Sequence, residues 1–320
     1  MKLWFGWLLG LFFAVTAQAE SSAEALQLLQ RMATSARTLT YSGTFVYQSG
    51  QRSETSRITH SADAEPDIEH IEMLDGSPRE VIRIGDEVRC YLPETRRMVI
   101  ERRTAQPRFP SLLPSGLADI DQHYTIRRVA NDRVAGFEAH PVSIEPRDDL
   151  RFRRQLWIDR KSGLLLKEES FDESGVLRES FAFTQLQIGG TVDREAIKAR
   201  FAQQDHGWKI KDVRASASRV EDGRWQFRTS LPGFKRVANM TRKVDSTGTE
   251  SIQMVFSDGL AAISVFVETV PPEAIQSEVR VFAMGAVNVY KRIAGKHLLV
   301  LMGDVPVAAL RRFGDGIDFK

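Results

Sequence analysis

Six histidines are the first residues to consider for metal or acid–base chemistry. They are His60, His70, His123, His140, His206 and His297. No two of them stand at metal-ligand spacing on a helix. His70 and Glu72 would share one face of a strand, but no third ligand accompanies them. We therefore interpret His70 as a solvent-facing strand residue, and the sequence predicts no metal site.

Serine and carboxylate chemistry finds no better support. Serines beside glycine occur in "PSGL" and "ESGV", which are typical of turns, and neither forms the G-x-S-x-G elbow of a nucleophile. The carboxylates are scattered, so no pair is marked as general acid and base. No glycine-rich phosphate loop is present. We expect a protein that is not an enzyme and binds no cofactor.

Arginines stand out because they come in pairs. The pairs are Arg96 and Arg97, Arg102 and Arg103, Arg127 and Arg128, and Arg153 and Arg154. Neighbours in a strand point to opposite faces, so each pair would offer one guanidinium to each side of a sheet. The favoured interpretation is a set of solvated strand edges balanced by acids such as Glu94 and Glu101. The other is that some arginines hold an anionic head group beside an apolar cavity.

The stretch "YSGTFVYQSGQRSETSRITH", which begins at Tyr41, predicts a hairpin with an aromatic face. Side chains alternate along a strand, so Tyr41, Gly43, Phe45 and Tyr47 would share one side. In a flat or closed sheet these aromatics would be core. In a large curved sheet with helices across its concave side, the same face could line a cavity wide enough for acyl chains. Periodicity does not separate the two, and core packing is the default.

The elements that would position these residues are mostly strands. Over residues 41–187 short strand patterns alternate with turn signals, for example at 75–76 and 85–86, where Asp and Gly favour tight turns. Their regular spacing predicts nine to eleven sequential antiparallel strands in one large curved sheet. A proline-rich stretch over 101–121 interrupts the meander and predicts a loop with a short helix.

Two helices are expected on either side of the meander. Residues 22–37 carry apolar side chains at spacings of three and four, which predicts an amphipathic helix starting at Ser22. Residues 193–203 predict a second helix with Asp193 as its N-cap. A last short helix is expected over 307–313, at the end of a smaller α+β domain.

The first residues, "MKLWFGWLLGLFFAVTAQAE", have the three-part pattern of a secretory signal peptide with cleavage before Glu20. The alternative is an uncleaved anchor, but the apolar core is shorter than the roughly 18 residues that a spanning helix needs. The predicted divisions are 1–19 as signal peptide, 20–205 as curved-sheet domain, 206–223 as linker and 224–320 as C-terminal α+β domain.

Charge and cysteine content narrow the class further. The 44 Lys and Arg against 42 Asp and Glu leave a formal charge of +2, which for an exported chain argues against a nucleic-acid partner. The single cysteine, Cys90, excludes an internal disulfide, so stability depends on apolar core. Its strand context predicts a buried, inert thiol.

The strand patterns carry a resemblance to a known family. The segments "YSGTFVY", "HIEMLDGSPREVIRIGDEVRCYLP" and "HYTIRRVANDRVAGFEAHPVSIEP" resemble the N-terminal domain of the RseB/MucB family, periplasmic regulators of the sigma-E envelope stress response. The segments "SLPGF", "FSDGLAAISVFVE" and "GAVNVYKRIAGKHLLVLMGDVP" resemble its second domain. The match covers essentially the whole chain after the signal. It implies a mainly β, α+β fold, with an unclosed β-barrel similar to the lipoprotein carrier LolA and a smaller α+β domain.

The resemblance also implies a function. Members bind the periplasmic part of an RseA/MucA-type anti-sigma factor, shield it from site-one proteolysis, and let go on sensing lipopolysaccharide or mislocalised lipoprotein. The alternative is a periplasmic lipid or lipoprotein carrier of the LolA type, although such a carrier ends after one barrel. The sequence leaves open a homo-oligomer and a lid role for the loop over 101–121.

The implied sites fall on aromatic and leucine side chains. The lipid cavity would include Tyr41, Phe45, Tyr47, Leu112, Leu113 and Leu117. The partner-binding surface would include Trp225, Phe227 and Phe234. Core packing explains each of these aromatics at least as well.

Overall fold

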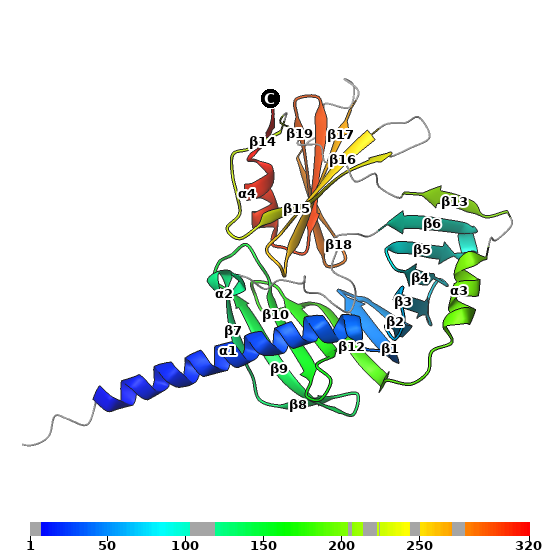
Figure 1. Ribbon diagram of the computed structural model, residues 1–320. Helices are drawn as coiled ribbons and strands as arrows, with labels where there is room; N and C mark the ends of the chain where they lie inside the picture. Colours follow the sequence, from blue (N-terminus) through cyan, green and yellow to red (C-terminus); the bar gives the residue numbers. More distant parts are fainter. Residues whose placement is uncertain are drawn as a thin grey trace, which may run out of the picture.

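The computed structural model describes residues 8–102, 119–203, 207–213, 223, 225–243, 250–270 and 279–320. Within these ranges the chain forms a 13-stranded sheet, a 6-stranded sheet and a 2-stranded ribbon. The large sheet curves at the base of the molecule and the smaller sheet stands above it (Figure 1). This is the predicted fold class, a large unclosed sheet followed by a smaller α+β unit.

The large sheet is built almost wholly from sequential hairpins. Its strands are β1 (Tyr41–Ser49), β2 (Arg52–Ser61), β3 (Ile68–Met73), β4 (Glu80–Ile84), β5 (Glu87–Leu92), β6 (Arg97–Arg102), β7 (Tyr124–Arg128), β8 (Asp132–Val134), β9 (Phe137–Pro146), β10 (Arg153–Asp159), β11 (Leu165–Phe171), β12 (Leu177–Ile188) and β13 (Lys209–Asp212). The order is β13-β6-β5-β4-β3-β2-β1-β12-β11-β10-β9-β7, with β8 beside β9. All these pairs are antiparallel except β13 with β6, which is parallel.

The strand number was underestimated from the sequence. The strands β1 to β12 all lie in the predicted meander, rather than nine to eleven. The short strand β6 was missed because its apolar core, Met98 to Ile100, is flanked by arginines. The strand β8 was also missed: Ala135 and Gly136, both at positive φ, form the tight turn that separates it from β9.

Gly43 shows why the aromatic strand carries a glycine. A Cβ at this position would lie 2.4 Å from the carbonyl oxygen of Gln185 on β12, which no side chain tolerates. The register between the two strands shifts just beyond, between Thr44 and Phe45. Such a bulge increases the local twist of a sheet, so it contributes to the curvature here.

One half of the large sheet is covered by α1 (Leu8–Thr38). Leu29 and Met32 are fully buried in one cluster with Ile144 and Leu156 from β9 and β10. The predicted helix is confirmed, but its predicted start is wrong. The helix begins at Leu8, and the Ser22 hydroxyl donates a hydrogen bond to the Ile126 carbonyl oxygen at 3.2 Å instead of capping an N-terminus. No described helix combines the length and apolar character needed to cross a membrane.

The other half of the sheet is covered on one face by α3 (Arg194–Ala202). The carboxylate of Asp193 accepts a hydrogen bond from the backbone N–H of Ala196 at 2.9 Å, so the predicted N-cap is confirmed. Ile197 is buried in a cluster with side chains of β3 to β6, and Phe201 packs against that cluster. The predicted loop over 101–121 starts too early, because Glu101 and Arg102 belong to β6, and its residues 103–118 lie outside the described residues. The helix α2 (Ile120–His123) follows, and an η1 turn (Pro93–Thr95) joins β5 to β6.

In its described residues, the C-terminal unit is a sheet with one helix. Its elements are β14 (Trp225–Phe227), β15 (Lys235–Lys243), β16 (Glu250–Ser257), β17 (Ala262–Thr269), β18 (Arg280–Met284), β19 (Val287–Ala294), β20 (His297–Gly303), α4 (Val307–Gly314) and β21 (Ile317–Phe319). The sheet order is β15-β16-β17-β20-β19-β18, and β14 pairs with β21. Leu310 and Phe313 of α4 pack on Ile263 and Leu301, which confirms the predicted final helix.

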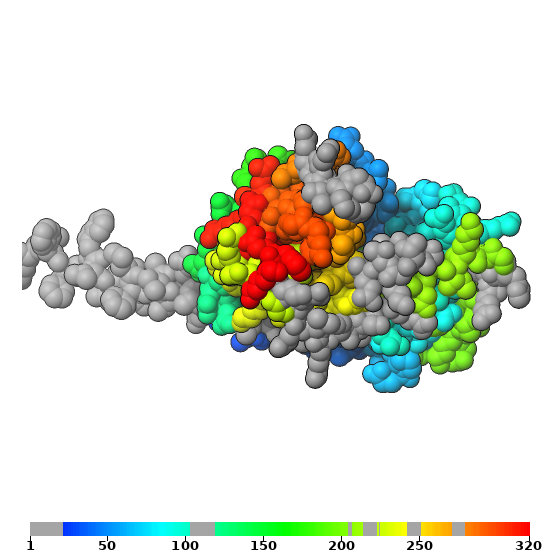
Figure 2. Space-filling view, turned by 90° about the horizontal axis from the view of Figure 1, so that it is seen from above, coloured from blue at the N-terminus to red at the C-terminus, as the bar shows by residue number. Residues whose placement is uncertain are grey.

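The strand β13 lies in the segment that we predicted as a linker, and it extends the first sheet by one parallel pairing with β6. The domain divisions at 205 and 223 remain predictions. Seen from above, the C-terminal unit (yellow to red) lies over the middle of the molecule, and the cyan strands extend to one side of it (Figure 2).

Candidate functional site

The strands β3 to β6 have apolar side chains on both faces. On one face Ile82, Tyr91 and Met98 pack in the cluster that includes Ile197 of α3. The residues next to these in sequence point to the opposite face, as alternation requires. There Val81, Val88, Cys90 and Val99, with others, line a cavity of about 490 Å³. A volume of this size is typical of small-molecule pockets.

The cavity changes character across the sheet. Its apolar wall continues through Phe45 of β1 and Phe181 of β12. The lining also carries charge: Arg154, Glu168 and Glu179 contribute from β10, β11 and β12, and Glu54, Arg79 and Glu101 contribute elsewhere. An apolar wall with a charged region beside it suits a ligand that has an apolar chain and a polar head.

The structure separates the aromatic residues that the sequence placed on one face. Phe45 and Tyr47 line the cavity. Tyr41 does not appear in its lining, because its fully buried ring stacks on His60 with a centroid distance of 5.0 Å and joins the core under α1. Tyr41 is therefore core, Phe45 belongs both to that core and to the cavity wall, and a lipid-binding role of this face stays a prediction. The other predicted cavity residues, Leu112, Leu113 and Leu117, lie outside the described residues.

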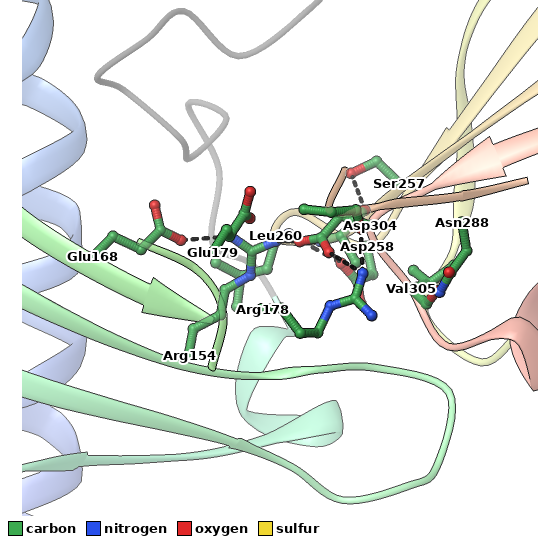
Figure 3. A network of polar contacts seen from close by, with 12 residues as sticks. Arg154, Glu168, Arg178, Glu179, Ser257, Asp258, Leu260, Asn288, Asp304 and Val305 are labelled. Carbon is green, nitrogen blue, oxygen red and sulfur yellow. Dashed lines mark hydrogen bonds and ion pairs between the residues drawn. The ribbon is translucent and has the colours of Figure 1, made fainter. Parts of the chain in front are cut away.

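Arg154 connects the cavity to the C-terminal unit (Figure 3). One terminal nitrogen of its guanidinium donates to Glu168 at 2.5 Å, and the other donates to Asp304, directly after β20. The exposed fractions of the three side chains are 11% for Arg154, 8% for Glu168 and 19% for Asp304. Of the sequence pair Arg153 and Arg154, therefore, one member does face a cavity.

Two further side chains extend this network. Arg178 of β12 donates to the carbonyl oxygen of Ala286 and lies 3.6 Å from the second oxygen of Asp304. The Tyr47 hydroxyl donates to Glu179 at 2.8 Å. We refer to Tyr47, Arg154, Glu168, Arg178, Glu179 and Asp304 as the bridging network. It joins the charged part of the cavity to the turn after β20.

Burial and neighbouring negative charges raise the pKa values of several groups in the bridging network. Burial, together with the charge of Asp304, raises the pKa of Glu179 from 4.5 to about 7. Burial also raises the pKa of Glu168, against the opposing effect of the Arg154 charge. The pKa of Tyr47 is raised by burial and by Glu179, so this phenol stays protonated and donates. Glu179 is therefore only partly ionised near neutral pH.

A second ion pair joins the two units away from the cavity lining. The side chain of Arg151 is fully buried, and its Nε donates to the equally buried Asp258 at 2.5 Å. The guanidinium also donates to the Asp148 carboxylate and to the Pro232 carbonyl oxygen. The Tyr124 hydroxyl donates to Asp258 at 2.9 Å. Nothing in the sequence marked Arg151, because its acceptors come from distant segments.

The three aromatics predicted for partner binding lie in the C-terminal unit. Trp225 is 6% exposed in the core of that unit, and Phe227 and Phe234 pack against the same core. The Arg151 guanidinium lies 5.0 Å from the centre of the Phe234 ring. This packing favours the core interpretation for Trp225, and the partner role of all three stays a prediction.

Two single-residue interpretations are wrong. His70 does not face solvent, because its side chain is 18% exposed and its Nε2 lies 2.9 Å from a carboxylate oxygen of Glu80. Cys90 is half-buried and lines the cavity instead of being enclosed in the core. Among the residues that the structure describes, no three His, Cys, Asp or Glu side chains come together as metal ligands.

Comparison with protein-family models identifies the family to which this chain belongs. Residues 24–201 match the MucB/RseB N-terminal domain, and residues 219–318 match the MucB/RseB C-terminal domain. The chain therefore belongs to the MucB/RseB family, as its strand patterns suggested.

Individual relatives match over nearly their full length. The chain is 30% identical over 309 residues to the sigma factor AlgU regulatory protein MucB of Pseudomonas aeruginosa, which covers 95% of this chain and 93% of the relative. It is 22% identical over 324 residues to the sigma-E factor regulatory protein RseB of Escherichia coli K12, which covers 99% and 98%.

Solved structures of the family have the same fold. The complex of Pseudomonas aeruginosa MucA and MucB aligns with a TM-score of 0.71 and 25% identity over 93% of this chain and 99% of that one. A crystal structure of MucB in complex with MucA(peri) aligns with a TM-score of 0.70 and 24% identity, over 92% and 99%.

Proposed function

We propose that this protein is a periplasmic negative regulator of sigma-E signalling that binds the periplasmic domain of an RseA/MucA-type anti-sigma factor. The observation that carries this proposal is the match to MucB across both units and nearly the whole length. A solved structure of such a relative is a complex with MucA. Export by a signal peptide, cleaved before Glu20, would place the chain in the periplasm.

The mode of action follows from linkage. By binding the anti-sigma factor, the regulator would shield it from site-one proteolysis. A lipopolysaccharide or lipoprotein signal that prefers the free regulator must weaken its hold on the anti-sigma factor by the same factor. The apolar cavity beside the bridging network supports an acyl-chain ligand, and its volume of about 490 Å³ gives such a chain a place to bind. Regulation of this kind needs no catalysis.

The second candidate is a periplasmic lipid or lipoprotein carrier. The cavity alone favours it, because a carrier needs a place for acyl chains and little else. The C-terminal unit argues against it, since a sheet of 6 strands tied to the first unit by buried ion pairs of Arg151, Arg154 and Arg178 has no role in a simple carrier.

Titration calorimetry of the purified chain from Glu20 onward with the periplasmic domain of its own anti-sigma factor tests the proposal. We expect micromolar or tighter binding, weakened when lipopolysaccharide is present. The polysaccharide portion without its acyl chains is the matched control and should leave the affinity unchanged. If the two proteins do not bind while the chain retains lipid, the carrier function replaces the regulator.

A further inference from the structure

We propose that Asp304 occupies, from the C-terminal unit, a site for the anionic head group of an amphiphile in the cavity, so that head group and Asp304 compete for Arg154. The inference rests on the proposed lipid-sensing function and names the chemistry of the ligand's polar end. A carboxylate or a phosphate fits this chemistry. The Asp304 carboxylate and the ligand's head group would thus bind the same guanidinium in turn.

The position of Arg154 gives the first step. Its side chain belongs to the cavity lining, yet one of its two terminal nitrogens is used by the other unit through Asp304. The other lining arginine within the described residues, Arg79, pairs at 3.4 Å with Glu54, and both of these side chains are 44% exposed. Arg154 is 11% exposed, so an anion that reaches it loses much less of its attraction to water screening.

The charge balance gives the second step. On the first unit, Arg154 pairs with Glu168 and shares the cavity lining with Glu179, while Arg178 lies 3.6 Å from Asp304. Glu179 is partly neutral near pH 7, because burial and neighbouring carboxylates raise its pKa to about 7. Asp304 is one of those carboxylates, so Glu179 would ionise more fully without it. What the first unit would then lack is an acceptor for the second terminal nitrogen of Arg154, and Asp304 supplies that acceptor.

The hydrogen bonds around Asp304 give the third step. The Oδ1 atom of Asp304 and the Nε atom of Arg178 are both buried and have no hydrogen-bond partner among the described residues. The shortest approach of Asp304 to Arg178 is an ion pair at 3.6 Å, longer than a charge-assisted hydrogen bond. Asp304 thus satisfies Arg154 but only part of Arg178. A phosphate, with more acceptor oxygens, can engage both guanidinium groups.

The competition has a consequence for the contact between the units. A head group on Arg154 would displace the ion pair of Arg154 with Asp304, one of the buried ion pairs that join the units, and Arg151 with Asp258 would remain. The ligand and the observed contact are then linked reciprocally, so weakening the contact must tighten ligand binding.

The experiment compares three ligands with the same chain: hexadecyl phosphate, hexadecanoate and the neutral hexadecanol, all below their aggregation limits. Calorimetry measures their binding to wild type, to Asp304→Asn, and to Asp318→Asn. The last variant removes one carboxylate from the same unit, at β21, where Asp318 pairs with Arg228 and Arg292 away from the cavity lining. Thermal unfolding verifies that each variant is folded.

We expect Asp304→Asn to raise the affinity for the anionic ligands at least fivefold, the lower end of typical coupling between sites. Hexadecanol should change less than twofold, and Asp318→Asn should change nothing. A gain for hexadecanoate alone identifies a fatty-acid carboxylate, and a gain for hexadecyl phosphate alone identifies a phosphorylated lipid. Arg154→Gln is the second variant and should abolish the preference for anionic over neutral ligand.

Other outcomes overturn the inference. An equal gain for hexadecanol means that Asp304 only restricts access to the cavity, and no gain for any ligand means that it does not compete. If none of the three ligands binds any form of the chain, the lipid-sensing function fails together with the inference. Binding of the anti-sigma factor, measured separately, is unaffected by that result.

Discussion

The two sheets of this protein differ in how their inner faces are filled. In the C-terminal unit, Ile263, Val265 and Leu301 are completely buried, and α4 closes the sheet with Leu310 and Phe313. In the large sheet, α1 covers the half around β7 to β12, whereas the concave face of β3 to β6 lines a cavity. The same alternation of side chains thus gives a core where a helix covers it and a cavity elsewhere.

Two of the arginines that join the units, Arg151 and Arg154, repeat this contrast. Arg151 is fully enclosed, and its donors meet two carboxylates and a carbonyl oxygen. Arg154 faces the cavity, and the network around it leaves buried polar atoms without a hydrogen bond from the described residues. Saturated contacts are suited to holding a structure together, and unsaturated contacts beside a cavity are suited to exchange with a ligand.

The largest expected effect is on the saturated side. The substitution Arg151→Ala leaves the completely buried Asp258 without its ion-pair partner. This loss should lower the unfolding free energy by about 3–5 kcal/mol. Urea unfolding measures this. The control is Arg57→Ala, whose pair with Glu72 is exposed at 56% and 41% and should contribute at most about 1 kcal/mol. Equal losses of unfolding free energy for the two variants would show that the buried ion pair of Arg151 stabilises the fold no more than an exposed one.

The next effect is a pH dependence on the unsaturated side. Folding raises the pKa of Glu179 from 4.5 to about 7, so the folded chain holds this proton more tightly than the unfolded chain. The resulting stability is fully present below pH 4.5 and is lost as the pH rises to about 7. Its upper limit is about 3 kcal/mol, from 1.36 kcal/mol for each pKa unit.

Glu179→Gln tests this assignment, because the amide keeps the shape and does not titrate. Between pH 5 and pH 7.5 the variant should lose less stability than wild type, as measured by urea unfolding at each pH. A slope that the substitution does not change would show that other groups carry the pH dependence.

The sequence predicted features that depend on neighbouring residues, and it did not predict contacts between distant ones. Local patterns identified the family, most strands, the Asp193 cap and the final helix, because each depends on residues close together in the chain. The pairing of Arg154 with Asp304 spans 150 residues and was not marked by any local pattern. The sequence singled out Arg154 only as one of several paired arginines.

The aromatic strand shows the same limit at the level of one element. The alternation of side chains correctly placed Tyr41 and Tyr47 on one face of the strand, but it did not show what that face contacts. Whether the face meets core or cavity depends on which helix lies over each end, and this is decided by tertiary packing. Tyr41 therefore became core and Tyr47 cavity, with the same residue type in the same strand.

A matched pair of valines tests the two faces directly. Val265→Ala removes two methyl groups from the filled core and should cost about 2–3 kcal/mol, since a cavity is left behind. Val99→Ala enlarges a space that already exists, so it should cost less than about 1.5 kcal/mol. Urea unfolding of the two variants gives the comparison. Similar losses would mean that the cavity wall is packed as tightly as the core.

The smallest effect concerns α3, which packs on the face of β3 to β6 opposite the cavity. Asp193→Ala removes the side chain that accepts from the Ala196 N–H, and it should cost about 1 kcal/mol. Asp193→Asn keeps an N-cap acceptor and should change stability by only a few tenths of that amount. Hydrogen exchange at Ile197 and in β4 and β5 shows whether the loss stays in α3 or reaches the strands. Faster exchange in the strands would show that the cavity wall depends on α3, because Ile197 packs directly on its outer face.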